Sequence, residues 1–266
     1  MSRLLIYIPL LFSACNNLPQ ANTKTNTNLH LNTIDTITYS YNTISEHSEF
    51  FIANEDIIDT TYFKITYPIF SKDNLNDSIK KYILIDGENT PAEAAQSFID
   101  GYDEFASDLQ GNGIHGTWFK DVNSQVILNT PMLISLATQV NEYSGGAHGQ
   151  HYTLYANFDL HRNQTIILED ILQKDKLKEL TAIAEKHFRK QENIDEKESL
   201  SKDFFFEDGI FTLNDNFGFT KNSLIIYYNE YEIRPYADGP TILEIPYKDL
   251  KDVFNIRGQE FVKSIL

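Results

Sequence analysis

Residues 141–159 read Asn-Glu-Tyr-Ser-Gly-Gly-Ala-His-Gly-Gln-His-Tyr-Thr-Leu-Tyr-Ala-Asn-Phe-Asp, and this stretch decides the fold. Apolar and polar side chains alternate before it, over residues 132–140, and again within it, over residues 152–159. Alternation with a period of two is typical of half-buried strands. The intervening segment Gly145–Gly149 contains three glycines, and glycine adopts the positive φ angles that tight turns need. The sequence therefore predicts a long antiparallel hairpin whose glycine-rich tip can face a partner.

The rest of the chain contains clusters of strand-like and helix-like segments rather than a strict βαβ alternation. Strands are expected at residues 36–45, 49–53, 60–67, 114–123, 125–129, 132–143, 210–213, 217–220, 223–228 and 241–245. Helices are expected at residues 75–84, from 91 to a stop at 111–113, at 168–171, 175–191 and 247–253. This order predicts an α+β fold of antiparallel sheets and a few packed helices. We expect two tightly associated subdomains, residues 34–130 and 131–266.

The helix that begins at Pro91 has the clearest signals. Thr90 is an N-cap, Pro91 occupies the first helical position, and Glu93 completes a capping box. Four residues at helical spacing form its expected buried stripe, which fits a core better than a cofactor site: Phe98, Tyr102, Phe105 and Leu109. In the helix over residues 175–191, the residues expected to face inward are Leu177, Leu180, Ala184 and Phe188.

The composition limits the classes of partner. The chain has 266 residues and a net charge of −16, with a pI near 4.8. This charge argues against binding nucleic acid, whose phosphates require a basic surface. It is compatible with a cationic protein partner, and equally with an acidic surface that serves only solubility.

The N-terminus resembles an export signal. Arg3 precedes the apolar run Leu4–Phe12, and small residues then lead to Cys15, the single cysteine of the chain. We expect residues 1–14 to be a lipoprotein signal peptide and Cys15 to carry the lipid. The alternative is an ordinary secretory signal or a short buried helix. Residues 15–33 are rich in Asn and Thr and are expected to be a flexible tether, so the protein would meet the membrane only through its lipid.

Catalytic and metal-binding motifs are not evident in the sequence. His148 and His151 are three residues apart within a glycine turn, whereas helical zinc histidines are four residues apart. We therefore expect a structural role for these histidines rather than a zinc site. The sequence contains no Gly-x-Ser-x-Gly motif and no phosphate-binding loop. We therefore expect no metal, no cofactor and no catalytic residue, although a pair of carboxylates of the glycosidase type stays open.

A second loop, Asn229–Pro240, is the other candidate for partner binding. Tyrosine and arginine are enriched at binding hot spots, and proline and glycine restrict the loop. Alternatively, Tyr236 only packs over the end of a sheet and Gly239 only makes a turn. We expect this loop and the hairpin tip to lie near one another and to form one face. The residues expected to bind a partner are Tyr143, Gly145, Gly146, His148, Tyr231, Arg234, Pro235, Tyr236 and Gly239.

Several motifs resemble a known extracytoplasmic domain family. They are Tyr143-Ser-Gly-Gly-Ala-His-Gly, Asn157-Phe-Asp-Leu, Leu168-Glu-Asp-Ile-Leu, and Tyr231-Glu-Ile-Arg-Pro-Tyr-Ala-Asp-Gly-Pro followed by Glu244-Ile-Pro-Tyr-Lys-Asp-Leu. The family includes the ectodomain of a lysozyme-sensing anti-sigma factor (RsiV), the non-catalytic part of PdaC-type peptidoglycan deacetylases, and many bacterial lipoproteins. The resemblance implies a PdaC-like N-terminal and an RsiV-like C-terminal subdomain.

The resemblance and the sequence together suggest a cell-envelope lipoprotein at the outer membrane or on the periplasmic face, with a non-catalytic, monomeric ectodomain. Its expected partner is a lysozyme-type muramidase, which is commonly cationic, or peptidoglycan. The alternative is a cell-wall glycan hydrolase or deacetylase that uses carboxylates which the sequence does not pair. A deep cleft with two facing carboxylates would favour the enzyme, and a shallow surface lined by tyrosines would favour binding.

Overall fold

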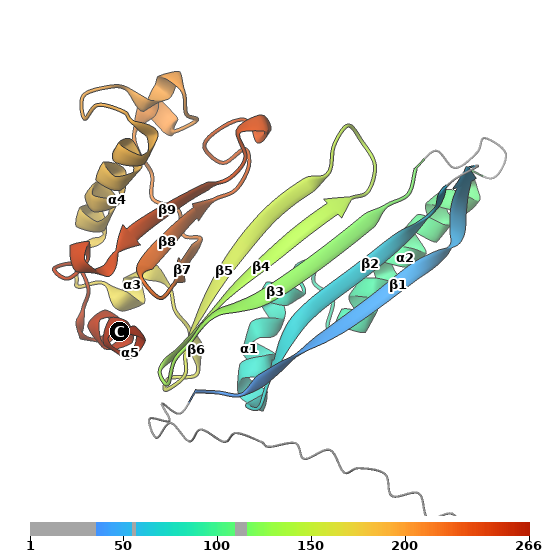
Figure 1. Cartoon of the computed structure of the whole chain (residues 1–266), viewed down its shortest axis with the longest axis horizontal. Helices are drawn as coiled ribbons and strands as arrows, with labels where there is room; N and C mark the ends of the chain where they lie inside the picture. The colour runs from blue at the N-terminus through green and yellow to red at the C-terminus, as the bar shows by residue number, and fades with distance from the viewer. Residues whose placement is uncertain (1–35, 55–56, 110–115) are drawn as a thin grey trace, which may run out of the picture. The chain divides into compact units, whose positions relative to one another are not determined.

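The computed structural model describes residues 36–54, 57–109 and 116–266, which form a six-stranded and a three-stranded sheet with helices (Figure 1). The larger sheet has the order β1-β2-β3-β4-β5-β6. Its strands are β1 (Tyr39–Asn54), β2 (Ile57–Phe70), β3 (Phe119–Asn129), β4 (Leu133–Tyr143), β5 (Gln150–Asp159) and β6 (Gln164–Thr165). The predicted α+β class is confirmed.

One pair of strands departs from the predicted antiparallel arrangement. β2 and β3 are parallel, and all other neighbours in both sheets are antiparallel. The reason lies in the connection, because the chain leaves β2, forms α1 (Asp73–Ile83) and α2 (Pro91–Asp108), and returns beside β2 in the same direction. A parallel pair requires a crossover of this kind. The predicted division between residues 130 and 131 falls inside this sheet, between the paired strands β3 and β4.

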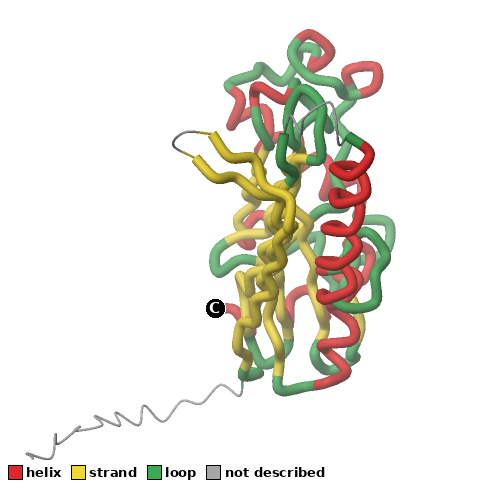
Figure 2. Tube along the Cα trace, turned by 90° about the vertical axis from the view of Figure 1, so that its right-hand side faces the viewer, coloured by secondary structure: helices red, strands yellow, loops and turns green. Residues whose placement is uncertain are grey.

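Helices α1 and α2 pack against one face of the large sheet (Figure 2). The core between them contains Phe63, Ile65 and Val122 from the strands. On α2, the buried residues are Ala94, Ala95, Ile99, Tyr102 and Ala106. Of the predicted aromatic stripe, Tyr102 is buried and Phe98 packs partly buried against the core, whereas Phe105 does not face inward. Small alanines let the helix approach the sheet, whereas Phe105 is 41% exposed and stacks on Trp118 with ring centroids 5.2 Å apart.

The predicted cap of α2 is present with one difference. The hydroxyl of Thr90 accepts a hydrogen bond from the Glu93 amide at 3.1 Å. The Glu93 carboxylate, however, accepts from the amide of Asn89 rather than from that of Thr90. Two amides at the start of the helix are still satisfied, which is what a capping box achieves.

The hairpin of β4 and β5 agrees with the alternation in the sequence. Leu136 pairs with Ala156 and Val140 pairs with Tyr152, so the predicted faces are confirmed. Two asparagines cover the outer edge of β5. Asn216 accepts from the Tyr155 amide and donates to the Thr153 carbonyl, both at 2.7 Å, and Asn229 accepts from the Thr153 amide at 2.7 Å. These side chains act as a partner strand and protect an edge that would otherwise be open.

The second sheet has the order β7-β8-β9. Its strands and the helices around it are β7 (Phe217–Phe219), β8 (Ser223–Tyr228), β9 (Thr241–Pro246), α3 (Leu168–Ile171), α4 (Leu177–Glu192) and α5 (Ile256–Ile265). On α4, Leu180, Ala184 and Phe188 are buried as predicted, but Leu177 is 41% exposed because it opens the helix. Helix α5 was not predicted, and the strand expected at residues 210–213 is absent.

Candidate functional site

The hairpin tip and the loop between β8 and β9 meet, as expected from the sequence. The rings of His148 and Tyr236 stack with centroids 4.6 Å apart. Tyr231 lies 5.6 Å from Tyr236, and His151 lies 6.3 Å from Tyr236. We call His148, His151, Tyr231 and Tyr236 the tip cluster. His148, His151 and Tyr231 are exposed and Tyr236 is half-buried, so the cluster presents ring surface to solvent.

Hydrogen bonds position three of the four rings of the tip cluster, and Tyr236 stacks on His148. His148 Nδ1 lies 2.8 Å from the Gly149 carbonyl, which can only accept, so Nδ1 carries the proton. Its other ring nitrogen, Nε2, lies 3.3 Å from the Tyr231 hydroxyl. His151 Nδ1 lies 2.7 Å from the Asn141 side-chain oxygen. The cluster therefore has a fixed arrangement at the end of a rigid sheet.

The backbone of both segments adopts conformations that few residues tolerate. Gly145 and Gly146 have φ angles of +106° and +94°, as a glycine tip requires. Tyr231 is in the left-handed region at φ +67°, where a residue with a side chain is strained. Strain of this kind concentrates at ligand sites. The Tyr143 hydroxyl donates to the Gly146 carbonyl at 3.1 Å and so fastens the tip to β4.

Arg234 does not join the tip cluster. Its guanidinium Nη2 lies 3.0 Å from a Glu192 carboxylate oxygen on α4, and it stacks over the Phe204 ring at 5.0 Å. The neighbouring Ile233 is buried. Arg234 therefore anchors the loop to the second core. Pro235 precedes the short 3₁₀ turn Tyr236–Asp238, and that turn ends at Gly239, whose φ is +69°.

The carboxylates that converge in the described residues are bound by a lysine rather than facing each other across a cleft. Lys120 is buried and pairs with Asp86 and with Glu142, the latter at 2.8 Å. Burial alone would lower the pKa of Lys120, but the hydrogen bonds and charges of the two carboxylates outweigh it and raise that pKa. The two carboxylates thus share one lysine cation. Among residues 36–54, 57–109 and 116–266, no group of three or more His, Cys, Asp and Glu is placed to hold a metal ion.

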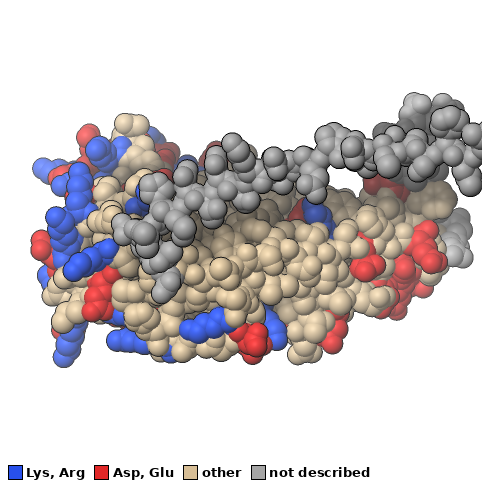
Figure 3. Space-filling view, turned by 60° about the horizontal axis from the view of Figure 1, so that its bottom comes forward, with Lys and Arg blue, Asp and Glu red and all other residues tan. Residues whose placement is uncertain are grey.

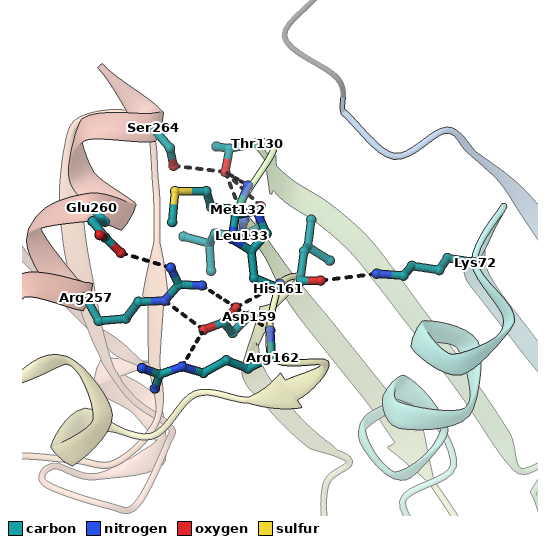
Figure 4. A network of polar contacts seen from close by, with 11 residues as sticks. Lys72, Thr130, Met132, Leu133, Asp159, His161, Arg162, Arg257, Glu260 and Ser264 are labelled. Carbon is teal, nitrogen blue, oxygen red and sulfur yellow. Dashed lines mark hydrogen bonds and ion pairs between the residues drawn. The ribbon is translucent and has the colours of Figure 1, made fainter.

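The Asn157-Phe-Asp-Leu motif joins the two sheets, a role that the sequence did not reveal. The Asn157 amide donates to the Phe217 carbonyl at 2.8 Å, and its oxygen accepts from Ser135. Asp159 forms a bidentate pair with Arg257 of α5, with one N–O distance of 2.8 Å (Figure 4). Its carboxylate also accepts from the amide of His161 at 2.9 Å.

The environment of Asp159 changes its acidity. Burial alone would raise the pKa of this carboxyl, but the hydrogen bonds of Arg257 and of two backbone amides, together with the Arg257 charge, lower it below its ordinary value. Asp159 therefore stays ionised at the junction of β5 and α5, where it is a structural residue. On the α5 side, Thr130 and Ser264 add a hydrogen bond of 3.1 Å (Figure 4).

The charges are unevenly distributed. Lys and Arg gather on the side of α3 to α5, and Asp and Glu gather on the side of β1, β2 and α2 (Figure 3). Helix α2 alone carries five acidic residues and neither Lys nor Arg. Much of the acidity thus lies away from the tip cluster. Cys15 and the expected signal and tether fall outside the described residues, and no helix within them is long and apolar enough to cross a membrane.

Two family models match the chain. Residues 54–151 match the model described as Deacetylase PdaC, and residues 169–248 match DUF3298, described as a protein of unknown function. The resemblance to PdaC-like domains is therefore confirmed, and a segment similar to PdaC is followed by a segment similar to DUF3298. The tip cluster combines both matched segments, since His148 belongs to the first and Tyr231 and Tyr236 belong to the second.

Known proteins with similar sequences or folds agree with these matches. The peptidoglycan-N-acetylmuramic acid deacetylase PdaC of Bacillus subtilis is 19% identical over 199 residues, which are 73% of this chain but 39% of that protein. A DUF3298 family structure from Bacteroides fragilis has a TM-score of 0.67 at 22% identity and covers 86% of this chain and 97% of its own. One from Pseudomonas aeruginosa also has a TM-score of 0.67, at 16% identity, and covers 84% of this chain and 97% of its own. At these identities the structures establish the fold alone.

Proposed function

We propose that this protein is a lipid-anchored module of the bacterial cell envelope that binds the glycan of peptidoglycan without cleaving it. The observation that carries the proposal is the tip cluster, in which four rings from the β4–β5 hairpin and the loop between β8 and β9 lie together and present ring surface to solvent. Aromatic rings stack on the apolar faces of sugars, and histidine and tyrosine also hydrogen-bond hydroxyl and acetamido groups. The matched relative acts on N-acetylmuramic acid in peptidoglycan, which supports the same polymer as the ligand here.

The arrangement of the described carboxylates supports the hypothesis that the protein binds the glycan without cleaving it. A glycosidase requires two carboxyl groups on either side of a scissile bond, with space for the sugar between them. Asp86 and Glu142 converge, but buried Lys120 occupies the position between them. A solvent-exposed group of tyrosines and histidines fits a binding module better.

Replacing Tyr236 by Ala is expected to weaken binding to purified peptidoglycan about tenfold or more, because truncating a hot-spot tyrosine typically costs at least 2 kcal/mol. Co-sedimentation of the purified ectodomain with insoluble peptidoglycan measures the change. Phe205→Ala is the matched control, since this aromatic side chain is also exposed, at 56%, but lies outside the cluster. Equal binding by wild type and the Tyr236 variant would place the site elsewhere.

A lysozyme-type muramidase is the second candidate partner. The residues around Tyr231 and Tyr236 include Glu230, Glu232 and Asp238, which suit a cationic protein. Calorimetry of the ectodomain against lysozyme, in the same wild-type and Tyr236→Ala pair, separates the candidates. Lysozyme binding that is lost in the variant, with no binding to peptidoglycan, would replace the glycan proposal.

The lipid anchor has its own test. Cys15→Ser is expected to abolish lipidation, because the proposed attachment point of the lipid is the sulfur of Cys15. The protein should then move from the membrane fraction to the soluble envelope fraction. Fractionation and the mass of the mature protein measure both effects. A variant that remains membrane-bound with an unchanged mass contradicts lipidation at Cys15.

A further inference from the structure

A row of four aromatic side chains crosses the large sheet beside the tip cluster. His47, Tyr62, Phe119 and Tyr143 are direct cross-strand partners on β1, β2, β3 and β4. The centroid distances between neighbouring rings are 6.1, 5.9 and 6.2 Å. The Tyr62 and Phe119 rings are 17° from parallel, and the Phe119 and Tyr143 rings are 28° from parallel. We call these four residues the aromatic row.

The aromatic row lies on the face opposite α1 and α2. Side chains alternate between faces along a strand, and the neighbours Phe63 and Val122 belong to the core under the helices. Within the described residues, no helix covers the other face over β1 to β3 (Figures 1 and 2). His47 is exposed and the other three rings are half-buried, so a ligand can reach them.

The surroundings of the aromatic row are polar, and the charges that act on Tyr62 are those of Asp121 and Asp59. On the same face, the next positions along β3 and β4 are Asp121 and Asn141, followed by Asn123 and Gln139. The charge of Asp121 is opposed by Lys64 at 3.9 Å. Side-chain amides and hydroxyls beside aromatic rings can bind the hydroxyl and acetamido groups of an aminosugar chain. A charged protein partner, in contrast, would find few opposite charges on this face to pair with its own.

The aromatic row and the tip cluster are continuous. Tyr143 ends the row and donates its hydroxyl proton to Gly146 of the tip. Asn141, directly beside it on the same face, holds the His151 ring of the cluster. Three strand spacings make the row roughly 14 Å long, since neighbouring strands lie about 4.8 Å apart. The combined surface is therefore longer than the tip cluster alone.

We propose that the aromatic row is a second subsite for the same glycan chain, so that the protein binds an extended run of N-acetylated aminosugars across β1–β4 with one end in the tip cluster. This inference rests on the proposed function. Once the cluster holds one end of a chain, the next sugars are at a high effective concentration over the row. A chain long enough to reach the row therefore binds more tightly than a fragment that fills only the cluster.

The test compares two lengths of peptidoglycan glycan freed of peptide, a disaccharide and an octasaccharide, by calorimetry with the wild-type ectodomain. The octasaccharide is expected to bind at least tenfold more tightly. Tyr62→Ala is expected to remove most of this difference and to leave the disaccharide affinity unchanged, and Tyr62→Phe to retain it. Tyr41→Ala is the matched control, since Tyr41 is exposed on the same face of β1 but six residues from His47.

The outcomes separate the two proposals. Equal affinity for both lengths, or a length dependence that survives in Tyr62→Ala, overturns the aromatic row as a subsite while the tip cluster stands. Failure of wild type to bind either length overturns the proposed function and the row with it. A Tyr62→Ala variant that has lost its fold would also lose the disaccharide, and Phe119→Leu then repeats the comparison with an apolar replacement of the ring.

Discussion

Asp159→Asn is expected to lower the free energy of unfolding by about 3–5 kcal/mol, the usual effect of breaking a buried ion pair from one side. The Asp159 side chain is 2% exposed and that of Arg257 is 13% exposed. Asparagine keeps the size but removes the charge, which leaves the guanidinium without its bidentate partner. Urea unfolding, followed by circular dichroism, measures the change.

Arg162→Gln is the matched control for this prediction. Arg162 also points at Asp159, with an N–O distance of 3.8 Å, but its side chain is 54% exposed. Exposed pairs contribute at most about 1 kcal/mol, so this variant should stay close to wild type. The double variant Asp159→Asn with Arg257→Met should be more stable than Asp159→Asn alone, because it replaces a largely buried guanidinium, then held only by the exposed Glu260, with an apolar side chain. Similar effects of Asp159→Asn and Arg162→Gln would contradict the assignment of the junction to the Arg257 pair.

The pH dependence of stability follows from the lowered pKa of Asp159. A carboxyl whose pKa is lower in the folded than in the unfolded state stabilises the fold above its ordinary value of 3.8, and this contribution disappears as the pH falls through the folded-state pKa. The difference in stability between wild type and Asp159→Asn should therefore be full at neutral pH and shrink below pH 3.8.

The sequence predicted those parts of the fold that local patterns determine. The hairpin of β4 and β5 shows alternation in the sequence because its apolar face packs in the core under α1 and α2, whereas its other face contains polar residues such as Ser135 and Asn157 that are also buried. Helix α5 was missed because Gly258 interrupts its pattern. The structure explains that glycine, since a Cβ there would meet the Ile171 carbonyl oxygen at 2.6 Å. The close packing of α5 on α3 thus requires a glycine at position 258, and that glycine weakens the helical pattern in the sequence.

The candidate site was also predicted only in part, since local patterns reveal some of its contacts and not others. That the tip and the Tyr231–Gly239 segment meet was expected, because both are glycine-containing connections of the C-terminal half. The orientation of Arg234 was not, since its partner Glu192 is on a helix remote in sequence. The aromatic row could not be found either. Its central pair, Tyr62 and Phe119, depends on the parallel pairing of β2 and β3, for which the sequence has no local signal.

Phe188→Ala is expected to lower the free energy of unfolding by about 3–5 kcal/mol, the usual effect of removing a buried phenylalanine ring. The Phe188 ring is fully buried and packs on Phe204, Phe206 and Phe211 with centroids 4.9, 5.6 and 5.4 Å away. Phe204 in turn supports the guanidinium of Arg234. The cavity would therefore also loosen the loop that carries Tyr231 and Tyr236.

Leu177→Ala on the same helix is the control for Phe188→Ala. The sequence pattern predicts both residues to face inward, but in the structure Leu177 is 41% exposed. Truncation of such a side chain should change stability by less than about 1 kcal/mol. The urea midpoints of the two variants thus test whether stability follows the burial seen in the structure or the inward position predicted from the helical pattern. Comparable losses in both would mean that Leu177 also belongs to the core, and a small loss in Phe188→Ala would contradict the role of its ring as the centre of the second core.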